Sequence, residues 1–215
     1  MTHLRADIPL TIALAKGRLA EQTVGLLQAV GVDCSDLRDP GRKLVFADAA
    51  HGYRFILVKP GDVPTYVDHG VADIGVVGKD TLLEENRPLY ELLDLGFGAC
   101  RLCVAGFPGG EGQTGANFRV ATKYPNIARG YYAAQGRSIE IIKLSGSVEL
   151  GPLVGLSDVI VDIVESGGTL RANGLEVLET IGLVSARAVV NVVALKTKGQ
   201  KIRALIAALA AQLHQ

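Results

Sequence analysis

The sequence has no excess of charge of either sign, since 22 lysine and arginine residues balance 22 aspartate and glutamate residues. Proteins that hold nucleic acid or an anionic membrane over a broad surface usually carry a positive excess. We therefore expect no nucleic-acid partner and no membrane association. An anionic ligand would have to be bound by a local cluster of basic side chains.

Long apolar runs and paired cysteines are also scarce. No uncharged apolar stretch approaches the roughly 18 residues of a membrane span. Residues 1–10 lack the apolar segment of a signal peptide. Three cysteines cannot build a disulfide framework, which favours a reducing compartment. We expect a cytoplasmic protein.

Patterns that bind metals are missing as well. Cys100 and Cys103 lie in the segment C-R-L-C-V-A, which reads as a strand, and there this spacing sends the two side chains to opposite faces. The four histidines are scattered without ligand spacing. The sequence therefore predicts no metal site built by the protein alone.

What the sequence does contain is a regular alternation of short β-rich runs and helix-length segments. Strands are expected at 10–15, 43–47, 53–58, 71–78, 100–105, 118–122, 139–144, 158–164 and 188–195. Helices are expected at 19–30, from about 62 onward, and at 81–85, 125–135, 148–156, 170–181 and 201–213. Such alternation predicts an α/β protein whose sheets are mainly parallel and covered on both faces.

The many short units favour two α/β domains over one wide sheet. Domain I is expected to comprise residues 1–96 and 188–215, and domain II residues 97–187. Ligands of α/β folds bind at the carboxyl ends of the strands. We therefore expect the active site in the cleft between the domains.

The stretch E-S-G-G-T, residues 165–169, follows the expected strand 158–164 and precedes the expected helix 170–181. Backbone amides at the start of a helix and its macrodipole attract anions. Gly167 and Gly168 would let an anion approach the backbone closely, and Ser166 and Thr169 add hydroxyl donors. This turn predicts a phosphate-binding loop.

Two acids, Asp162 and Glu165, border this loop. Carboxylates repel phosphate but accept hydrogen bonds from the hydroxyls of a ribose. A phosphate loop beside such acceptors predicts a site for ribose 5-phosphate. The plainer alternative is a strand-to-helix turn in which Thr169 caps the helix and Asp162 is a structural acid.

The run E-L-G-P-L-V-G-L-S-D-V-I-V-D-I-V-E-S-G-G-T-L, residues 149–170, resembles the signature of the ATP phosphoribosyltransferase family. Other family-like stretches cover nearly the whole chain: A-L-A-K-G-R-L (13–19), R-K-L-V-F (42–46), D-V-P-T-Y-V-D-H-G-V-A-D-I-G-V-V-G-K-D (62–80), E-L-L-D-L-G-F-G-A-C-R-L (91–102), A-T-K-Y-P-N (121–126) and L-S-G-S-V-E (144–149). The resemblance implies a fold like that of periplasmic binding proteins. It also implies a glycosyltransferase of histidine biosynthesis that joins N1 of ATP to C1 of 5-phosphoribosyl 1-pyrophosphate (PRPP), giving N1-(5-phosphoribosyl)-ATP and pyrophosphate.

The resemblance also bears on partners. The long form of the family carries an additional C-terminal domain that binds histidine, and a sequence ending at Gln215 has no room for it. The chain is thus similar to the short form, which works with a regulatory subunit similar to histidyl-tRNA synthetase. A homodimer within a larger hetero-oligomer is the implied assembly.

Site residues follow from the resemblance, position by position. PRPP is assigned to Glu149, Asp162, Glu165, Ser166, Gly167, Gly168 and Thr169. ATP or pyrophosphate is assigned to Lys16, Arg18, Lys79 and Arg101, with Tyr124 packing on ATP. The candidate catalytic residues are Lys16, Arg18 and Arg42, the last reaching the leaving pyrophosphate in its own subunit or in a neighbouring one.

Two questions about these residues stay open at this level. The sequence does not settle which of Glu149, Asp162 and Glu165 touches the sugar and which faces the metal. Mg²⁺ is the expected cofactor, held mainly by substrate phosphates and water because no carboxylate cage is visible. Lys79 could equally be a solvated surface lysine.

Two other functions are compatible with parts of the sequence. The run 62–78 would suit a two-lobed solute-binding protein, although the missing signal peptide and the turn at 162–169 count against it. A phosphoribosyltransferase for another base is the other alternative. The basic cluster favours an acceptor that carries its own phosphates.

Overall fold

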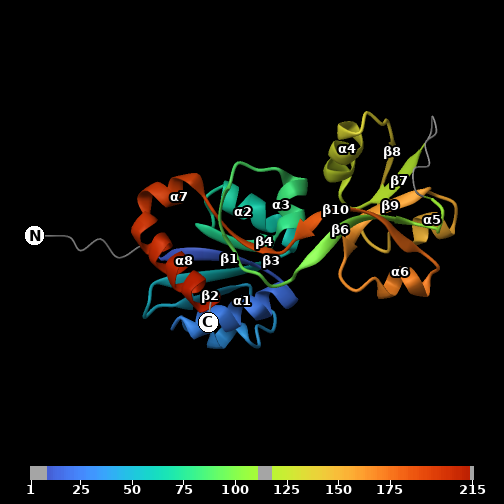
Figure 1. The fold of residues 1–215 in the computed structure, drawn as a ribbon. Helices are drawn as coiled ribbons and strands as arrows, with labels where there is room; N and C mark the ends of the chain where they lie inside the picture. Colours follow the sequence, from blue (N-terminus) through green and yellow to red (C-terminus); the bar gives the residue numbers. More distant parts are fainter. Residues whose placement is uncertain (1–8, 111–117, 214–215) are drawn as a thin grey trace, which may run out of the picture. The chain divides into compact units, whose positions relative to one another are not determined.

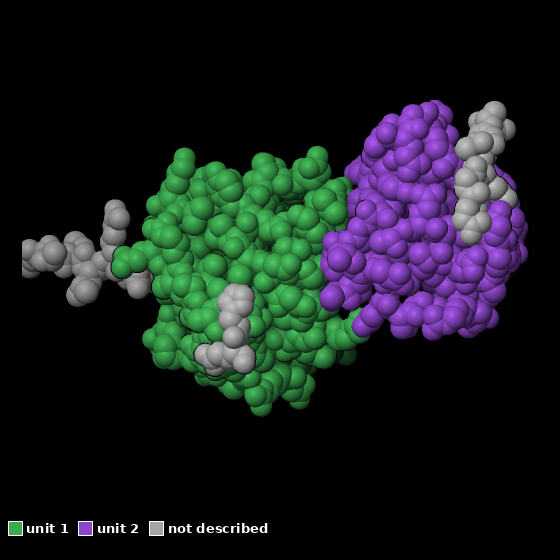
Figure 2. All heavy atoms as spheres, in the orientation of Figure 1, with its two compact units in different colours: residues 1–98, 185–215 green, residues 99–184 purple. Residues whose placement is uncertain are grey.

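The structure, a computed structural model, describes residues 9–110 and 118–213. The chain folds into two units (Figure 2), of which unit 1 comprises residues 1–98 and 185–215 and unit 2 comprises residues 99–184. Each unit has its own sheet and its own hydrophobic core.

Unit 1 is built on a six-stranded sheet with the order β2-β3-β1-β4-β11-β5 (Figure 1). Its strands are β1 (Leu10–Ala15), β2 (Val45–Asp48), β3 (Tyr53–Val58), β4 (Ile74–Gly78), β5 (Tyr90–Asp94) and β11 (Ala186–Val190). Its helices are α1 (Arg18–Ala29), η1 (Ser35–Leu37), η2 (Pro60–Asp62), α2 (Val63–Asp68), α3 (Lys79–Glu85), α7 (Val192–Thr197) and α8 (Gly199–Leu213).

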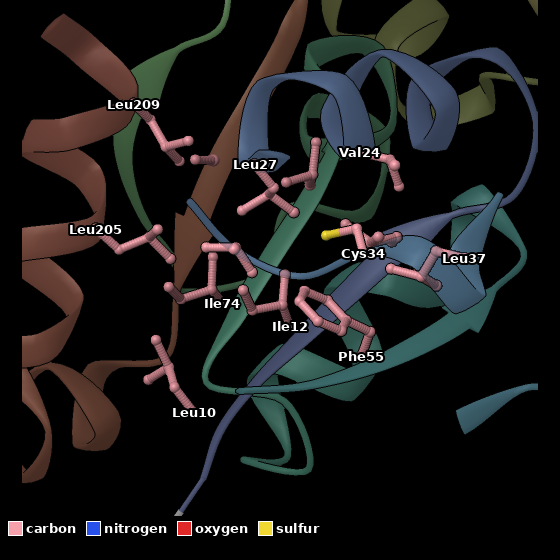
Figure 3. Packing of buried hydrophobic residues seen from close by; sticks show 14 of the residues in the cluster. Leu10, Ile12, Val24, Leu27, Cys34, Leu37, Phe55, Ile74, Leu205 and Leu209 are labelled. Atoms are coloured by element: carbon pink, nitrogen blue, oxygen red, sulfur yellow. The ribbon is translucent and has the colours of Figure 1, made fainter. Parts of the chain in front are cut away.

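Helices cover both faces of this sheet. Successive side chains of a strand point to opposite faces, so an apolar strand such as β1 contributes to a core on each side. On β1, Ile12 belongs to the core under α1 and α8, whereas Ala13 belongs to the core under α2 and α3. Figure 3 shows Ile12 in the first of these cores, with Leu27 from α1 and Leu205 from α8. The whole of β1 is therefore buried, and its carboxyl end leads directly into the loop before α1.

Unit 2 is built on a five-stranded sheet with the order β10-β6-β9-β7-β8. Its strands are β6 (Cys100–Gly106), β7 (Arg119–Thr122), β8 (Glu140–Lys143), β9 (Val159–Val164) and β10 (Glu176–Val184). Its helices are α4 (Pro125–Ala134), α5 (Leu150–Leu153) and α6 (Gly168–Ala172). Helix α4 covers one face of the sheet, and α6 lies on the other (Figure 1).

Both sheets contain parallel and antiparallel pairs. The prediction of mainly parallel sheets is therefore correct for only part of each sheet. Strands β3, β1 and β4 pair in parallel, as do β8, β7 and β9. The hairpin partner β2 and the strands next to the two chain crossings, β5, β6, β10 and β11, pair antiparallel. The α/β class is confirmed. Among the strands of the described residues, only β2 and β3 form a hairpin of consecutive strands, and the other antiparallel pairs join strands that are distant in the sequence.

The predicted helix 170–181 is wrong. Helix α6 covers only Gly168–Ala172, and strand β10 begins at Glu176. Gly174 has φ 68°, a left-handed conformation that ends the helix. The β-branched residues that follow pair with β6 along its full length. The apolar spacing of residues 170–181 fits a helix, but pairing with the distant strand β6 stabilises a strand from Glu176 onward.

The predicted strand 188–195 is correct only in its first half. Strand β11 ends at Val190, and the side chain of Asn191 accepts hydrogen bonds from the amides of Val193 and Ala194, both at 2.9 Å. This N-cap starts α7 at Val192. The cap residue was visible in the sequence, but the run of valines around it concealed the boundary.

Asp48 organises the turn after β2. Its side chain is 2% exposed and accepts hydrogen bonds from the amides of Asp33 and His51 at 3.0 and 3.1 Å. The His51 ring lies 2.7 Å away. Burial alone would raise the pKa of Asp48, but these donors outweigh it and hold the pKa below its ordinary value of 3.8.

Because the pKa of Asp48 is lower in the folded state, the free energy of unfolding is expected to decrease as the pH falls into the acid range. The contribution of the Asp48 carboxylate is complete above the unfolded-state pKa and is lost as pH falls through the lower folded pKa. We expect Asp48→Asn to lower the melting temperature at pH 7 and the gap to wild type to narrow below about pH 4. Thermal unfolding followed by circular dichroism from pH 7 to pH 3 measures this difference in melting temperature. Asp39→Asn, at an exposed acid of the same unit, serves as the control, and a gap independent of pH would contradict the prediction.

Candidate active site

The loop 165–169 of unit 2 connects β9 to α6. Ser166 and Thr169 are exposed, and Gly167 adopts φ 70° and ψ 13°, a left-handed conformation that favours glycine. Thr169 lies inside α6 and Gly167 is the N-cap residue, so the alternative of a Thr169 cap is wrong. Because α6 has five residues, its macrodipole is small, and the loop offers an anion mainly its local amides and hydroxyls.

Two side chains, one in α6 and one at its C-cap, hold carbonyl groups of this loop. The Arg171 Nη1 donates to the carbonyl oxygen of Ser166 at 2.9 Å, and the Asn173 Nδ2 donates to that of Thr169 at 2.8 Å. Neither residue was selected from the sequence. Their spacing of five and four residues from the carbonyls they bind would have indicated them, had a short helix been expected there.

Asp162 lies within β9, two residues before the strand ends at Val164, and beside the end of β7. The two strands are parallel with Thr122 opposite Val161, which brings Lys123 next to Asp162. The Lys123 Nζ is 3.9 Å from the Asp162 Oδ1, and this oxygen also accepts the amide of Ile163 at 2.8 Å. The acid therefore stands at the edge of the sheet from which the loop 165–169 departs.

Arg101 lies on the other side of the same strand. It is exposed at the start of β6 and pairs with Val164, the last residue of β9. Paired residues of antiparallel strands have Cα atoms about 5 Å apart. Unit 2 therefore places this arginine, which the resemblance assigned to ATP or pyrophosphate, close to the start of the loop 165–169.

The remaining predicted residues of unit 2 differ in exposure. Glu165 is exposed, and Glu149 is half-buried directly before α5, which packs against β9. Helix α5 covers only 150–153 of the predicted 148–156, because Gly155 at φ 72° lies beyond its end. Tyr124 is 4% exposed within the core, with the Lys123 Nζ 4.8 Å from its ring centre, so it presents little surface for stacking on ATP.

In unit 1, Lys16 and Lys79 lie at the same edge of the sheet. They follow the carboxyl ends of β1 and β4, which are parallel neighbours with Leu14 opposite Val76. Lys16 is exposed, whereas the Lys79 ammonium forms an ion pair with Glu91. One of the three donors of the Lys79 ammonium is therefore already used by Glu91.

A cavity of about 480 Å³ lies beside Lys16. Its residues are Lys16, Gly17, Ala20, Glu21, Val24, Gly25, Gln28, Leu37, Arg38, Pro40, Gly41, Lys43 and Leu57. The floor is apolar and the rim carries basic groups. Arg18 is exposed at the first position of α1, and Arg42 is exposed between two residues that line the cavity.

Metal ligands do not gather within the described ranges. Residues 9–110 and 118–213 contain no group of three or more His, Cys, Asp or Glu side chains able to hold a metal ion. Cys103 lies in the core under α6 and Cys100 packs against the core under α4, which confirms that the two thiols face opposite sides of the sheet. In the same ranges, no helix has both the length and the hydropathy of a membrane span.

Glycine amides and hydroxyls suited to a phosphate, next to an acid suited to ribose hydroxyls, place the chain among enzymes that act on phosphorylated ribose. Residues 59–211 match the family model described as HisG, ATP phosphoribosyltransferase. Relatives with the name ATP phosphoribosyltransferase include those of Alkaliphilus metalliredigens, 58% identical over 91% of this chain and 93% of the relative, and of Bacillus cereus strain B4264, 53% identical over 91% and 92%. The chain belongs to the ATP phosphoribosyltransferase family.

It is therefore the transferase that joins ATP to PRPP in the first step of histidine biosynthesis. Enzymes of this family use metal ions. A chain of the solved ATP phosphoribosyl transferase (HisG:HisZ) complex from Thermotoga maritima superposes with a TM-score of 0.84, at 37% identity over 95% of this chain and 97% of that one.

The fold is also that of a periplasmic binding protein, as the resemblance implied. The aliphatic sulphonate binding protein SsuA of Escherichia coli superposes with a TM-score of 0.58 over 95% of this chain and 72% of that one. Its identity of 14% supports a common fold alone. The family match therefore decides against the solute-binding alternative.

Proposed function

We propose that unit 2 binds PRPP, with the 5-phosphate on the loop 165–169 and the ribose hydroxyls on Asp162 and Glu149. The observation that carries the proposal is the position of Asp162. It lies near the carboxyl end of β9, and the loop with the exposed Ser166 and Thr169 follows directly after this strand. A carboxylate accepts from two hydroxyl groups, and the loop donates to phosphate oxygens. Glu165 is exposed in the loop, and we assign it to contact either the sugar or the metal ion.

Positive charge at this end of unit 2 supports the same assignment. Lys123 is 3.9 Å from Asp162, and Arg101 is paired with the last residue of β9. Both cations lie within reach of a phosphorylated ligand on that edge. We assign Arg101 to the pyrophosphate group.

On unit 1, we assign the phosphates of ATP to Lys16, and we assign Arg18 to ATP and to the charge that develops on the departing pyrophosphate. Lys16 lines the cavity, and Arg18 begins α1 two residues later. Arg42 extends the basic rim and is assigned to the leaving pyrophosphate, in its own subunit or in a neighbouring one. Lys79 and Tyr124 are kept in the proposed ATP set, although the Lys79 ammonium is already paired with Glu91 and Tyr124 is 4% exposed.

This division fits the chemistry of the family. Adenine N1 attacks the anomeric carbon with its own lone pair while the C1–O bond to pyrophosphate breaks, so no strong base is required. The protein must align two polyanions and stabilise the charge on the departing group. Fixed cations at strand ends provide that stabilisation without reorganisation during the reaction.

Mg²⁺ is the metal that we propose. The described residues form no cage of carboxylates, which fits an ion that keeps its waters and binds mainly to substrate phosphates. When bound, it neutralises pyrophosphate charge. The basic side chains then orient the substrates and add to this charge stabilisation.

We also propose a regulatory partner and a homodimer within a hetero-oligomer. The support is the likeness to a chain solved as part of a HisG:HisZ complex, over nearly the full length of both chains. A cytoplasmic location is proposed from the three free cysteines, Cys34, Cys100 and Cys103, and from the biosynthetic family.

Thr169→Ala is expected to raise the dissociation constant for PRPP about tenfold, because one hydroxyl donor to the phosphate is lost. The affinity for ATP should stay within about twofold of wild type, since the change lies on unit 2. Calorimetric titration of the full chain with PRPP and Mg²⁺ measures the dissociation constant for PRPP, and titration with ATP measures that for ATP. Wild-type affinity for PRPP in this variant would remove the loop 165–169 from the assignment.

A further inference from the structure

Arg171 holds the peptide groups on both sides of Gly167. Its Nη1 donates to the carbonyl oxygen of Ser166 at 2.9 Å, and its backbone amide donates to the carbonyl oxygen of Gly167 at 3.1 Å. Both contacts come from one residue of α6 and converge on one position of the loop 165–169. Arg171 is exposed, so the core of unit 2 does not need it.

The orientation of these carbonyls sets the orientation of the amides. A peptide group is planar and trans, so its C=O and N–H point in opposite directions. With the Ser166 carbonyl held by the guanidinium, the N–H of Gly167 points away from Arg171. The N–H of Gly168 is set in the same way by the Gly167 carbonyl, and it lies 3.4 Å from the Ser166 Oγ.

Glycine at position 167 makes such a restraint necessary. Its φ of 70° favours glycine, and a Cβ atom there would lie 3.2 Å from the Arg171 Nη1. The absence of a side chain lets the guanidinium lie close to the loop. It also lets the peptide between Ser166 and Gly167 rotate at low cost, which would turn a carbonyl oxygen toward the ligand.

We propose that Arg171 is a positioning residue, which keeps the amide of Gly167 directed toward the 5-phosphate by holding the Ser166 carbonyl on the opposite side. The inference rests on the proposed PRPP site. Without the guanidinium, the loop populates orientations in which a carbonyl oxygen repels the phosphate. The apparent affinity is then the intrinsic affinity multiplied by the fraction of loops that remain competent. Asn173 restrains Thr169 in the same manner at the other end of the loop.

Arg171→Met is expected to raise the dissociation constant and the KM for PRPP about tenfold, since a hydrogen bond from a charged donor is lost at an exposed position. The turnover at saturating PRPP, the affinity for ATP and the melting temperature should match wild type. Arg171→Lys keeps a donor able to reach the carbonyl and should recover most of the affinity. Arg129→Met removes an exposed arginine of α4 that donates to Asn126 in its own helix, and it is the matched control.

A double-mutant cycle separates positioning from direct contact. Gly167→Ala should itself weaken PRPP binding, because it strains the loop and displaces the guanidinium. If Arg171 acts through this peptide, adding Arg171→Met to Gly167→Ala causes little further loss. Additive losses would mean that Arg171 binds the phosphate directly, which overturns the proposal, as would an Arg171→Lys variant no better than Arg171→Met.

Thr169→Ala distinguishes failure of this inference from failure of the proposed site. If Thr169→Ala weakens PRPP binding and Arg171→Met does not, only the positioning role of Arg171 is wrong. If neither changes it, the loop 165–169 is not the phosphate site and both proposals fail.

Discussion

Asp73→Ala is expected to destabilise the protein by about 3 kcal/mol, the cost of leaving one partner of a largely buried ion pair without the other. The Asp73 Oδ2 accepts the Lys198 Nζ and the amide of Thr11, both at 2.7 Å. The side chains of Asp73 and Lys198 are 9% and 23% exposed. The carboxylate thus joins β1, the start of β4 and the end of α7 at one point. Chemical denaturation of the full chain measures the loss.

Two further variants make this prediction specific. Asp73→Asn keeps an acceptor for the Thr11 amide and should cost less than Asp73→Ala. Lys196→Met changes an exposed lysine of the same helix and should stay within about 0.5 kcal/mol of wild type. In a cycle with Lys198→Met, the losses should be non-additive, because both variants break the same pair. Additive losses, or a wild-type midpoint for Asp73→Ala, would contradict the role given to this pair.

Arg18→Ala is expected to lower turnover by roughly 10²–10³-fold with the fold intact, the loss found when a fixed group facing developing charge is removed. Arg18 is exposed at the first position of α1, so its removal leaves no cavity in the core. Lys16→Met should instead raise the KM for ATP, because the ammonium on the rim of the cavity is lost while its apolar stem is kept. Steady-state rates of phosphoribosyl-ATP formation from ATP, PRPP and Mg²⁺ separate the two effects.

The control for these variants lies at the opposite end of the same sheet. Lys198 of α7 contacts the carbonyl oxygen of Pro9, before β1 begins, whereas Lys16 follows the end of β1. Lys196→Met on α7 therefore removes a positive charge from unit 1 far from the cavity, and its rates should equal those of wild type. Wild-type turnover in Arg18→Ala would assign the charge stabilisation to other residues.

Short-range patterns located most of the elements on which these predictions depend. The buried run of β1 and the glycine after Lys16 predicted a strand end with basic residues, and the structure has both. The run before Asp162 and the glycines at 167 and 168 likewise predicted a strand, a turn and a helix start. These features depend on neighbours within a few residues, so the sequence contains them directly.

Contacts between distant residues could not be predicted in this way. Lys79 was a candidate for ATP, but its ammonium is paired with Glu91 on a strand that the sequence had not indicated. Tyr124 was a candidate for stacking, but the sheet of unit 2 buries it. The partner of Asp73, Lys198, lies 125 positions away in the sequence, so no local pattern indicates their contact.

The amino-acid order alone was sufficient for the α/β class and the family, because local alternation and motif spacing specify them, and it also predicts the loop 165–169 as the phosphate site. The direction of the edge strands, the strand that replaced the helix expected at 170–181, and the contact of Arg171 with Ser166 depended on the folded chain. The physical reason is that β-pairing and side-chain contacts are satisfied across the fold, and a segment with an ambiguous local preference takes the conformation that its partners stabilise.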